Sequence, residues 1–178
     1  RNFINQTLWF FAHEVAHLYQ PGNTDGVSEN NEQSWLHEGN ADYFAALAMN
    51  FLYEDTSSYV ENRTIRAFES CIEGLEQTTL ANAYKTGHFN LYYSCGMIMH
   101  RAIDNVVQQK TFGEESLFTV WQRLQKAVSK GMPPGTTTFL TLLEPYNAPE
   151  LMKAINDATR NDALKAIQGI EALYQMNQ

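Results

Sequence analysis

The sequence has little charge and lacks the features that mark several large classes of protein. Of its 178 residues only 18% are charged, and 12 Lys and Arg against 20 Asp and Glu give a net charge of −8. No basic run or patch is present, which argues against nucleic-acid binding. No apolar run reaches the length of a membrane span. A hydrophobic content of 44% at this length indicates a single globular domain, residues 1–178.

Cysteine is also scarce, since Cys71 and Cys95 are the only two in the chain. They can form one disulfide if the helices that carry them pack together, and an oxidising compartment would permit it. The alternative is two buried thiols in a cytosolic protein. We favour the bridge, and with it a periplasmic or secreted location.

The feature around which the chain is organised is His13-Glu14-Val15-Ala16-His17. We expect a helix over residues 3–19, ended by Pro21-Gly22, in which His13 and His17 lie one turn apart on one face. Two imidazoles at this spacing can bind one zinc ion, and Glu14 can reach a metal-bound water. An apolar stripe falls nearly opposite the two histidines and is expected to pack into the core: Ile4, Leu8, Phe11, Val15 and Leu18.

A second cluster lies in residues 35–43, after 20 intervening residues between His17 and Glu38. Alone, the first motif is short enough to arise by chance on a core helix. A catalytic zinc site needs three protein ligands and one open position, and Glu38 supplies the third ligand. Asp42 follows one helical turn later, where its carboxylate can accept the N–H of a ligating imidazole and fix its tautomer. The two clusters together predict a site for one zinc ion.

The rest of the chain is expected to be helical, which places the protein in the mainly α class. We expect Ser34 to cap a largely apolar helix over residues 35–53. Capping boxes at Ser58/Glu61 and Thr111/Glu114 are expected to open helices over 59–74, closed by Gly74, and from 111 to Lys130. Further helices are expected over 78–85, 90–110, 136–144 (ended by Pro145), and from Pro149 to Tyr174 with a break near Asn161.

With both clusters in view, the sequence resembles the gluzincin metallopeptidases, most closely the aminopeptidase-N-like and glycyl-aminopeptidase-like branches. The resemblance covers roughly residues 5–105 and rests on HExxH and on the W-L-x-E-G-x-x-x-Y of residues 35–43. It implies a multi-helix, zincin-type catalytic subdomain in which the HExxH helix packs beside the helix of the third ligand. The chain departs from the aminopeptidase-N-like pattern in its 20-residue spacing, where 18 is usual, and in His37, where asparagine is usual.

The same resemblance suggests a catalytic role for Tyr93, which stands three residues before Gly96 as in a Tyr-x-x-Gly element of these enzymes. Its hydroxyl would stabilise the oxyanion, which requires a neutral donor close to the developing charge. The alternative is a tyrosine pair, Tyr92 and Tyr93, that merely packs at a helix start. Cys95 replaces the lysine usual in the family. The other histidines, His37, His88 and His100, are not expected to be ligands, although His88 could line the cleft.

The sequence therefore predicts peptide-bond hydrolysis by a metal-activated water, with Glu14 as general base. A non-catalytic zinc-binding or scaffold module and a zinc hydrolase with other substrates remain as alternatives. Gluzincins carry a β-rich subdomain upstream that forms one wall of the cleft, and only 12 residues precede His13. We expect the chain to be a fragment, weakly active or inactive alone, with any signal peptide and the exopeptidase element Gly-x-Met-Glu-Asn upstream. Aminopeptidase and endopeptidase activity both stay open.

Overall fold

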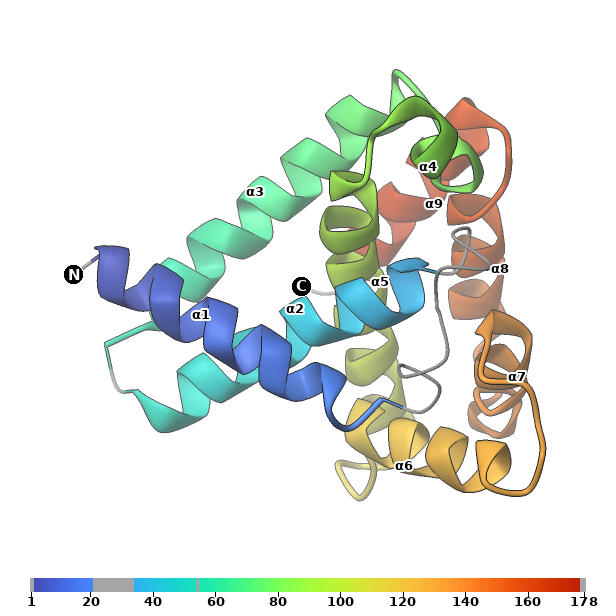
Figure 1. Cartoon of the computed structure of the whole chain (residues 1–178). Coiled ribbons are helices and arrows are strands. Elements are labelled where there is room, and N and C mark those ends of the chain that lie inside the picture. Colours follow the sequence, from blue (N-terminus) through green and yellow to red (C-terminus); the bar gives the residue numbers. More distant parts are fainter. Residues whose placement is uncertain (1, 21–33, 54, 177–178) are drawn as a thin grey trace.

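The structure, a computed structural model, describes residues 2–20, 34–53 and 55–176, and these residues contain helices and no strand. The mainly α class is confirmed for this part of the chain (Figure 1). The elements are α1 Asn2–His17, α2 Ser34–Leu52, α3 Ser57–Leu75, η3 Leu80–Asn82, α4 Ala83–Thr86, α5 Asn90–Lys110, α6 Leu117–Val128, α7 Thr136–Thr141, η4 Glu144–Tyr146, α8 Pro149–Ala158 and α9 Ala163–Gln175. None of the described helices is long and apolar enough to serve as a membrane span.

Helix α5 runs through the middle of the molecule, with α1 and α3 on its left and α6, α7 and α8 below it and to its right (Figure 1). Helix α2 packs against both α5 and α1. A single apolar core fills the space between these helices. Its largest fully buried side chains include Trp35, Leu36, Met49, Leu91, Met97, Ile98, Met99, Ile103, Leu117 and Phe139.

The crossing of α2 and α5 depends on two glycines. A Cβ added to Gly39 would lie 2.2 Å from the backbone carbon of Gly96, and one added to Gly96 would lie 2.6 Å from the carbonyl oxygen of Trp35. No other residue type allows two helix backbones to approach so closely. The crossing brings the start of α2, with Glu38, close to the start of α5, with Tyr93.

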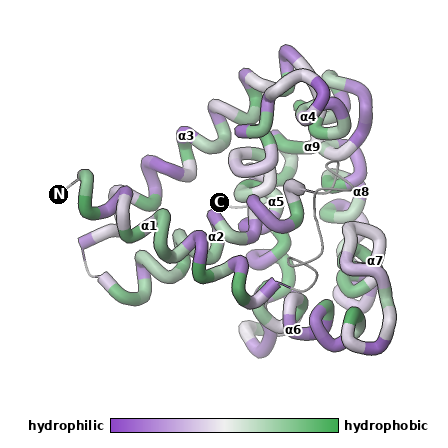
Figure 2. The backbone as a smooth tube through the Cα atoms, in the orientation of Figure 1, coloured by the Kyte–Doolittle hydropathy of each residue, from purple (hydrophilic) through white to green (hydrophobic). Residues whose placement is uncertain are grey.

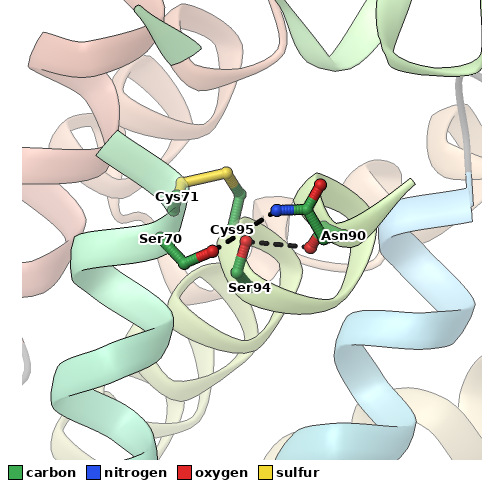
Figure 3. The surroundings of a disulfide bond; sticks show 5 residues. All are labelled: Ser70, Cys71, Asn90, Ser94 and Cys95. Atoms are coloured by element: carbon green, nitrogen blue, oxygen red, sulfur yellow. Dashed lines mark hydrogen bonds between the residues drawn. A yellow bond between two sulfur atoms is a disulfide. The ribbon is translucent and has the colours of Figure 1, made fainter. Parts of the chain in front are cut away.

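Helices α3 and α5 are joined by the disulfide between Cys71 and Cys95, whose Cα atoms are 5.0 Å apart (Figure 3). Both cysteines are fully buried. Beside them the Asn90 side-chain amide donates a hydrogen bond of 3.4 Å to the Ser70 hydroxyl. The bridge that the sequence favoured is therefore present.

The expected orientation of the first helix is wrong. The apolar stripe faces outward: Ile4 is 59% exposed, Phe11 61%, Val15 49% and Leu18 81%, and only Leu8 is partly buried against the core. Figure 2 shows apolar residues along α1 and at the end of α2, away from the centre of the molecule. Helix α1 instead buries Trp9, His13 and Ala16, because polar contacts with α2 decide which face turns inward.

Two predicted capping boxes are also wrong. Helix α3 follows Thr56, whose hydroxyl donates to the carbonyls of Met49 and Tyr53 at the end of α2, and not a Ser58/Glu61 box. Helix α6 begins at Leu117, and its capping box is formed by Ser116 and Thr119. The Thr111 hydroxyl, expected to open this helix, instead accepts a hydrogen bond from the Glu115 backbone N–H in the preceding turn.

Several other boundaries agree with the sequence. Helix α5 spans the expected residues 90–110, Pro149 occupies the first turn of α8, and Asp162 caps α9 next to the expected break at Asn161. Differences are small: Ser34 is the first residue of α2, α3 ends at Leu75 with Gly74 inside it, α6 ends at Val128, and Pro145 lies within η4. The helix stop expected at Pro21-Gly22 falls outside the described residues.

Candidate metal centre

Three potential ligand atoms converge between α1 and α2. His13 Nε2 and His17 Nε2 are 3.0 Å apart, and Glu38 Oε2 lies 3.3 Å from the first and 3.4 Å from the second. A tetrahedral zinc ion bound at about 2.0–2.1 Å from each ligand would hold the ligand atoms about 3.3 Å apart. The three atoms therefore have the mutual spacing of one face of a zinc coordination tetrahedron.

The local sequence explains this convergence. The four-residue spacing on α1 stacks the two imidazoles, whose ring centroids are 4.7 Å apart. Glu38 lies in the first turns of α2, beside Gly39 at the crossing with α5. Among the described residues this is the one group of three histidine, cysteine or acidic side chains whose ligand atoms lie close enough to hold a metal ion.

The orientation of His13 is fixed by Asp42, the residue expected to do this. The Oδ1 atom of Asp42 lies 2.9 Å from His13 Nδ1 and accepts a second hydrogen bond, of 2.9 Å, from the indole N–H of Trp9. A carboxylate only accepts, so His13 Nδ1 donates, and in the neutral ring the lone pair lies on Nε2, which faces the cluster. Trp9 was missed in the sequence, although its position one turn before His13 placed it on the same face.

His17 is oriented by a different residue, which the sequence analysis also missed. Its Nδ1 lies 2.8 Å from the Oε1 atom of Gln20. Gln20 is three residues beyond His17, and this spacing is the signal that could have identified it.

The electrostatics of the three groups favour a bound cation. Burial alone would lower the pKa of His13, but hydrogen bonds with Asp42 and Glu38 outweigh it and raise that pKa to about 9. The hydrogen bond with Glu38 also raises the pKa of His17. Burial alone would raise the pKa of Glu38, but hydrogen bonds with the two histidines lower it to about 2. Without metal the cluster holds protons, and a metal ion would take their place.

Tyr93 and Glu14 lie at the same site. The Tyr93 ring stacks on His13 with centroids 5.7 Å apart and an interplanar angle of 23°. Burial, the Glu38 carboxylate and, more weakly, the charge of Glu14 raise the pKa of Tyr93 to about 12, so its hydroxyl is neutral at neutral pH. Glu14 itself is exposed on α1. Tyr92 points elsewhere, since its buried hydroxyl accepts a hydrogen bond from the Tyr84 backbone N–H.

The three remaining histidines are not part of the cluster. His37 is buried and its Nδ1 lies 3.3 Å from Gln20 Oε1, while burial lowers its pKa to about 4. His100 is fully buried, contacts the Gly96 carbonyl through Nδ1, and has a pKa lowered to about 3 by burial. His88 is partly buried and contacts Gln77 and Thr86.

Comparison of the chain with protein-family models, curated proteins and solved structures finds no match. The proposals that follow therefore depend on the geometry of the cluster and on the sequence motifs.

Proposed function

We propose that the chain is the helical catalytic part of a gluzincin-like zinc peptidase, with one Zn²⁺ bound by His13, His17 and Glu38. The observation that supports this most directly is the tetrahedral spacing of the three ligand atoms, 3.0 to 3.4 Å. Two imidazole nitrogens that both present lone pairs at such a distance repel each other unless a proton or a metal ion lies between them.

The side chains around the cluster suit peptide hydrolysis. A bound zinc ion would supply Lewis acidity and lower the pKa of a water molecule towards neutrality. Glu14, exposed beside the cluster, would take the proton of the attacking water and pass it to the leaving amine. The neutral hydroxyl of Tyr93 would donate a hydrogen bond to the oxyanion. These roles require an open side of the cluster, and Glu38 is only partly buried there.

We also propose that a further part of the parent protein packs on the outer face of α1, the face nearly opposite His13 and His17. The exposed face of α1 carries large apolar side chains, and Phe51 and Leu52 at the end of α2 are exposed as well. A surface of this kind is typical of an interface. In the family that the sequence resembles, a β-rich subdomain lies upstream and forms one wall of the cleft. The buried disulfide supports a proposed periplasmic or secreted location.

The test combines metal analysis with a hydrolysis assay on the protein that contains this chain. We expect about one zinc per chain, lost in Glu38→Ala, and cleavage of peptides in a fluorogenic panel that includes free and blocked amino termini. Zinc binding without cleavage of peptides would favour the scaffold module. Cleavage of esters or other amides alone would favour a different hydrolase, and absence of zinc would refute the proposal.

A further inference from the structure

We infer that Gln20 is a positioning residue of the metal centre, which holds His17 in the tautomer that leaves Nε2 available to a metal ion. The inference rests on the proposed zinc site but assigns a role to a residue outside the ligand set. Gln20 lies just beyond α1 in sequence and is 7% exposed. A buried side-chain amide needs hydrogen-bond partners, and those of Gln20 define its role.

Both the oxygen and the nitrogen of the Gln20 side-chain amide have hydrogen-bond partners. Its Oε1 lies 2.8 Å from His17 Nδ1 and 3.3 Å from His37 Nδ1. Its Nε2 donates to the backbone carbonyl of His37 at 2.8 Å and to Oδ1 of Asn40 at 3.0 Å. Every polar atom of the side chain thus has a partner, and three of the four contacts are with α2.

This network decides the orientation of the amide. A backbone carbonyl can only accept, so the Gln20 atom that faces the His37 carbonyl must be the NH₂ group. The atom that faces His17 is then the amide oxygen, which can only accept. His17 Nδ1 must therefore carry the proton and donate it, and the lone pair of the ring lies on Nε2, which faces His13 and Glu38.

The two histidine ligands are thus held by chemically different partners. His13 donates to the carboxylate of Asp42, and His17 donates to a neutral amide. Gln20 has a second effect, because His37 and Asn40 flank the third ligand, Glu38, on α2. By bonding to both, Gln20 joins the end of α1 to the turn of α2 that carries Glu38. It therefore fixes the direction of the His17 ring and its place relative to Glu38.

Two substitutions separate this role from simple packing. Gln20→Met keeps the length of the side chain but removes the acceptor for His17. Gln20→Glu keeps an acceptor for His17 and loses the donors to α2, so a carboxylate oxygen faces the His37 carbonyl. Asn40 has a buried Nδ2 with no hydrogen-bond partner, and its amide can turn to donate to that carboxylate. If Gln20 only fills space, Gln20→Met should bind metal better than Gln20→Glu. If Gln20 positions His17, Gln20→Glu should bind metal better than Gln20→Met.

The experiment measures zinc affinity by competition with a chromophoric chelator, together with the visible spectrum of the Co²⁺-substituted protein. We expect Gln20→Met to weaken zinc binding by about tenfold to a hundredfold and to alter the Co²⁺ spectrum, as loss of an outer-sphere partner does. Gln20→Glu should keep zinc affinity within about threefold of wild type. Gln122→Met, the same change at an exposed glutamine of α6, is the matched control and should bind zinc normally. Wild-type affinity in Gln20→Met, or an equal loss in Gln20→Glu, would overturn the inference.

A second measurement tests the role of Gln20 in zinc-free protein, so its result does not depend on whether the protein is a zinc peptidase. Two-bond ¹H–¹⁵N spectra of the histidine rings report the tautomer in zinc-free protein, at an alkaline pH where the rings are neutral. We expect His17 to be protonated on Nδ1 in the wild type and to shift towards Nε2 in Gln20→Met. If Gln20→Met shifts the tautomer of His17 but the protein binds no zinc, the proposed zinc peptidase is refuted and the role of Gln20 is supported. An unchanged tautomer in Gln20→Met would refute the role of Gln20, whatever the zinc result.

Discussion

The five residues of the HExxH motif comprise two candidate ligands, one exposed acid and two apolar side chains, and we expect the acid to have a role distinct from the ligands. Glu14 is exposed beside the cluster and does not belong to the group whose ligand atoms converge. We predict that Glu14→Gln keeps near-normal zinc content and lowers turnover by at least about a hundredfold, the usual weight of general base catalysis. Loss of zinc in this variant would make the residue structural, and retention of full activity would exclude this type of hydrolase.

Tyr93 offers a second prediction, with its neighbour as the control. Because its neutral hydroxyl would act only on the oxyanion, Tyr93→Phe should spare zinc and lower kcat and kcat/KM together, by about a hundredfold. Tyr92→Phe removes a buried hydroxyl that contacts the Tyr84 backbone. It should lower the melting temperature and leave the kinetics of the folded protein unchanged. A change in KM alone for Tyr93→Phe would assign that residue to substrate binding.

The stability of the metal-free protein should depend on pH, because the cluster gains and loses protons. The pKa of His13 is raised from 6.5 to about 9, so its stabilising effect is complete below pH 6.5 and is lost as the pH rises through 9. The pKa of Glu38 is lowered from 4.5 to about 2, so its effect is present above pH 4.5 and is lost towards pH 2. The melting temperature of the metal-free protein should fall from pH 6.5 to 9, whereas zinc-loaded protein should show no such fall, because metal replaces the protons. Thermal melts of both forms at matched pH values decide this.

At the scale of elements, the close crossing of α2 and α5 holds the first turns of α2, which carry Glu38, against α5, which carries Tyr93. In Gly96→Ala the new Cβ would meet the backbone of Trp35 and Gly39 at 2.6 and 2.7 Å. In Gly74→Ala the nearest atom, also at 2.6 Å, belongs to the side chain of Leu91, which can move. We predict that Gly96→Ala destabilises the protein by about 3 kcal/mol or more and weakens zinc binding, and that Gly74→Ala costs less. Denaturant unfolding and zinc titration of the two variants test this, and equal effects would contradict it.

The elements also show what the sequence could and could not predict. The limits of α5 followed from an apolar pattern between clear boundaries, and the start of α8 from Pro149. Periodicity located two opposite faces on α1 but could not tell which one turns inward. Trp9, His13 and Gln20 bond to side chains and backbone of α2, and these contacts bury the face that looked less apolar. Such contacts join residues 17 to 33 positions apart, which no local pattern encodes.

The sequence likewise identified some residues of the candidate site and not others. His13, His17, Glu38 and Asp42 could be identified because helical spacing fixes their relative directions within each helix. The spacing of three residues from His17 marks Gln20 as a possible partner, but the direction of its amide depends on acceptors in α2. The choice between Tyr92 and Tyr93 required the position of α5 against α1. The zinc proposal thus follows from sequence patterns, and the way each ring is held follows from tertiary structure.

At the scale of the whole molecule, the disulfide joins α3 to α5, which packs against most of the other helices. It spans 24 positions, and closing a loop of this length in the unfolded chain stabilises the folded state by about 3 kcal/mol. We predict that the double variant Cys71→Ala, Cys95→Ala melts about 6–12 °C lower than the wild type. Because Gly39 and Gly96 still set the crossing of α2 and α5, its zinc affinity should stay unchanged below the transition. Mass spectrometry of unreduced peptides must first show the bridge in protein made in an oxidising compartment. A large loss of zinc affinity in the folded double variant would mean that the bridge, and not the helix crossing, positions the candidate metal ligands.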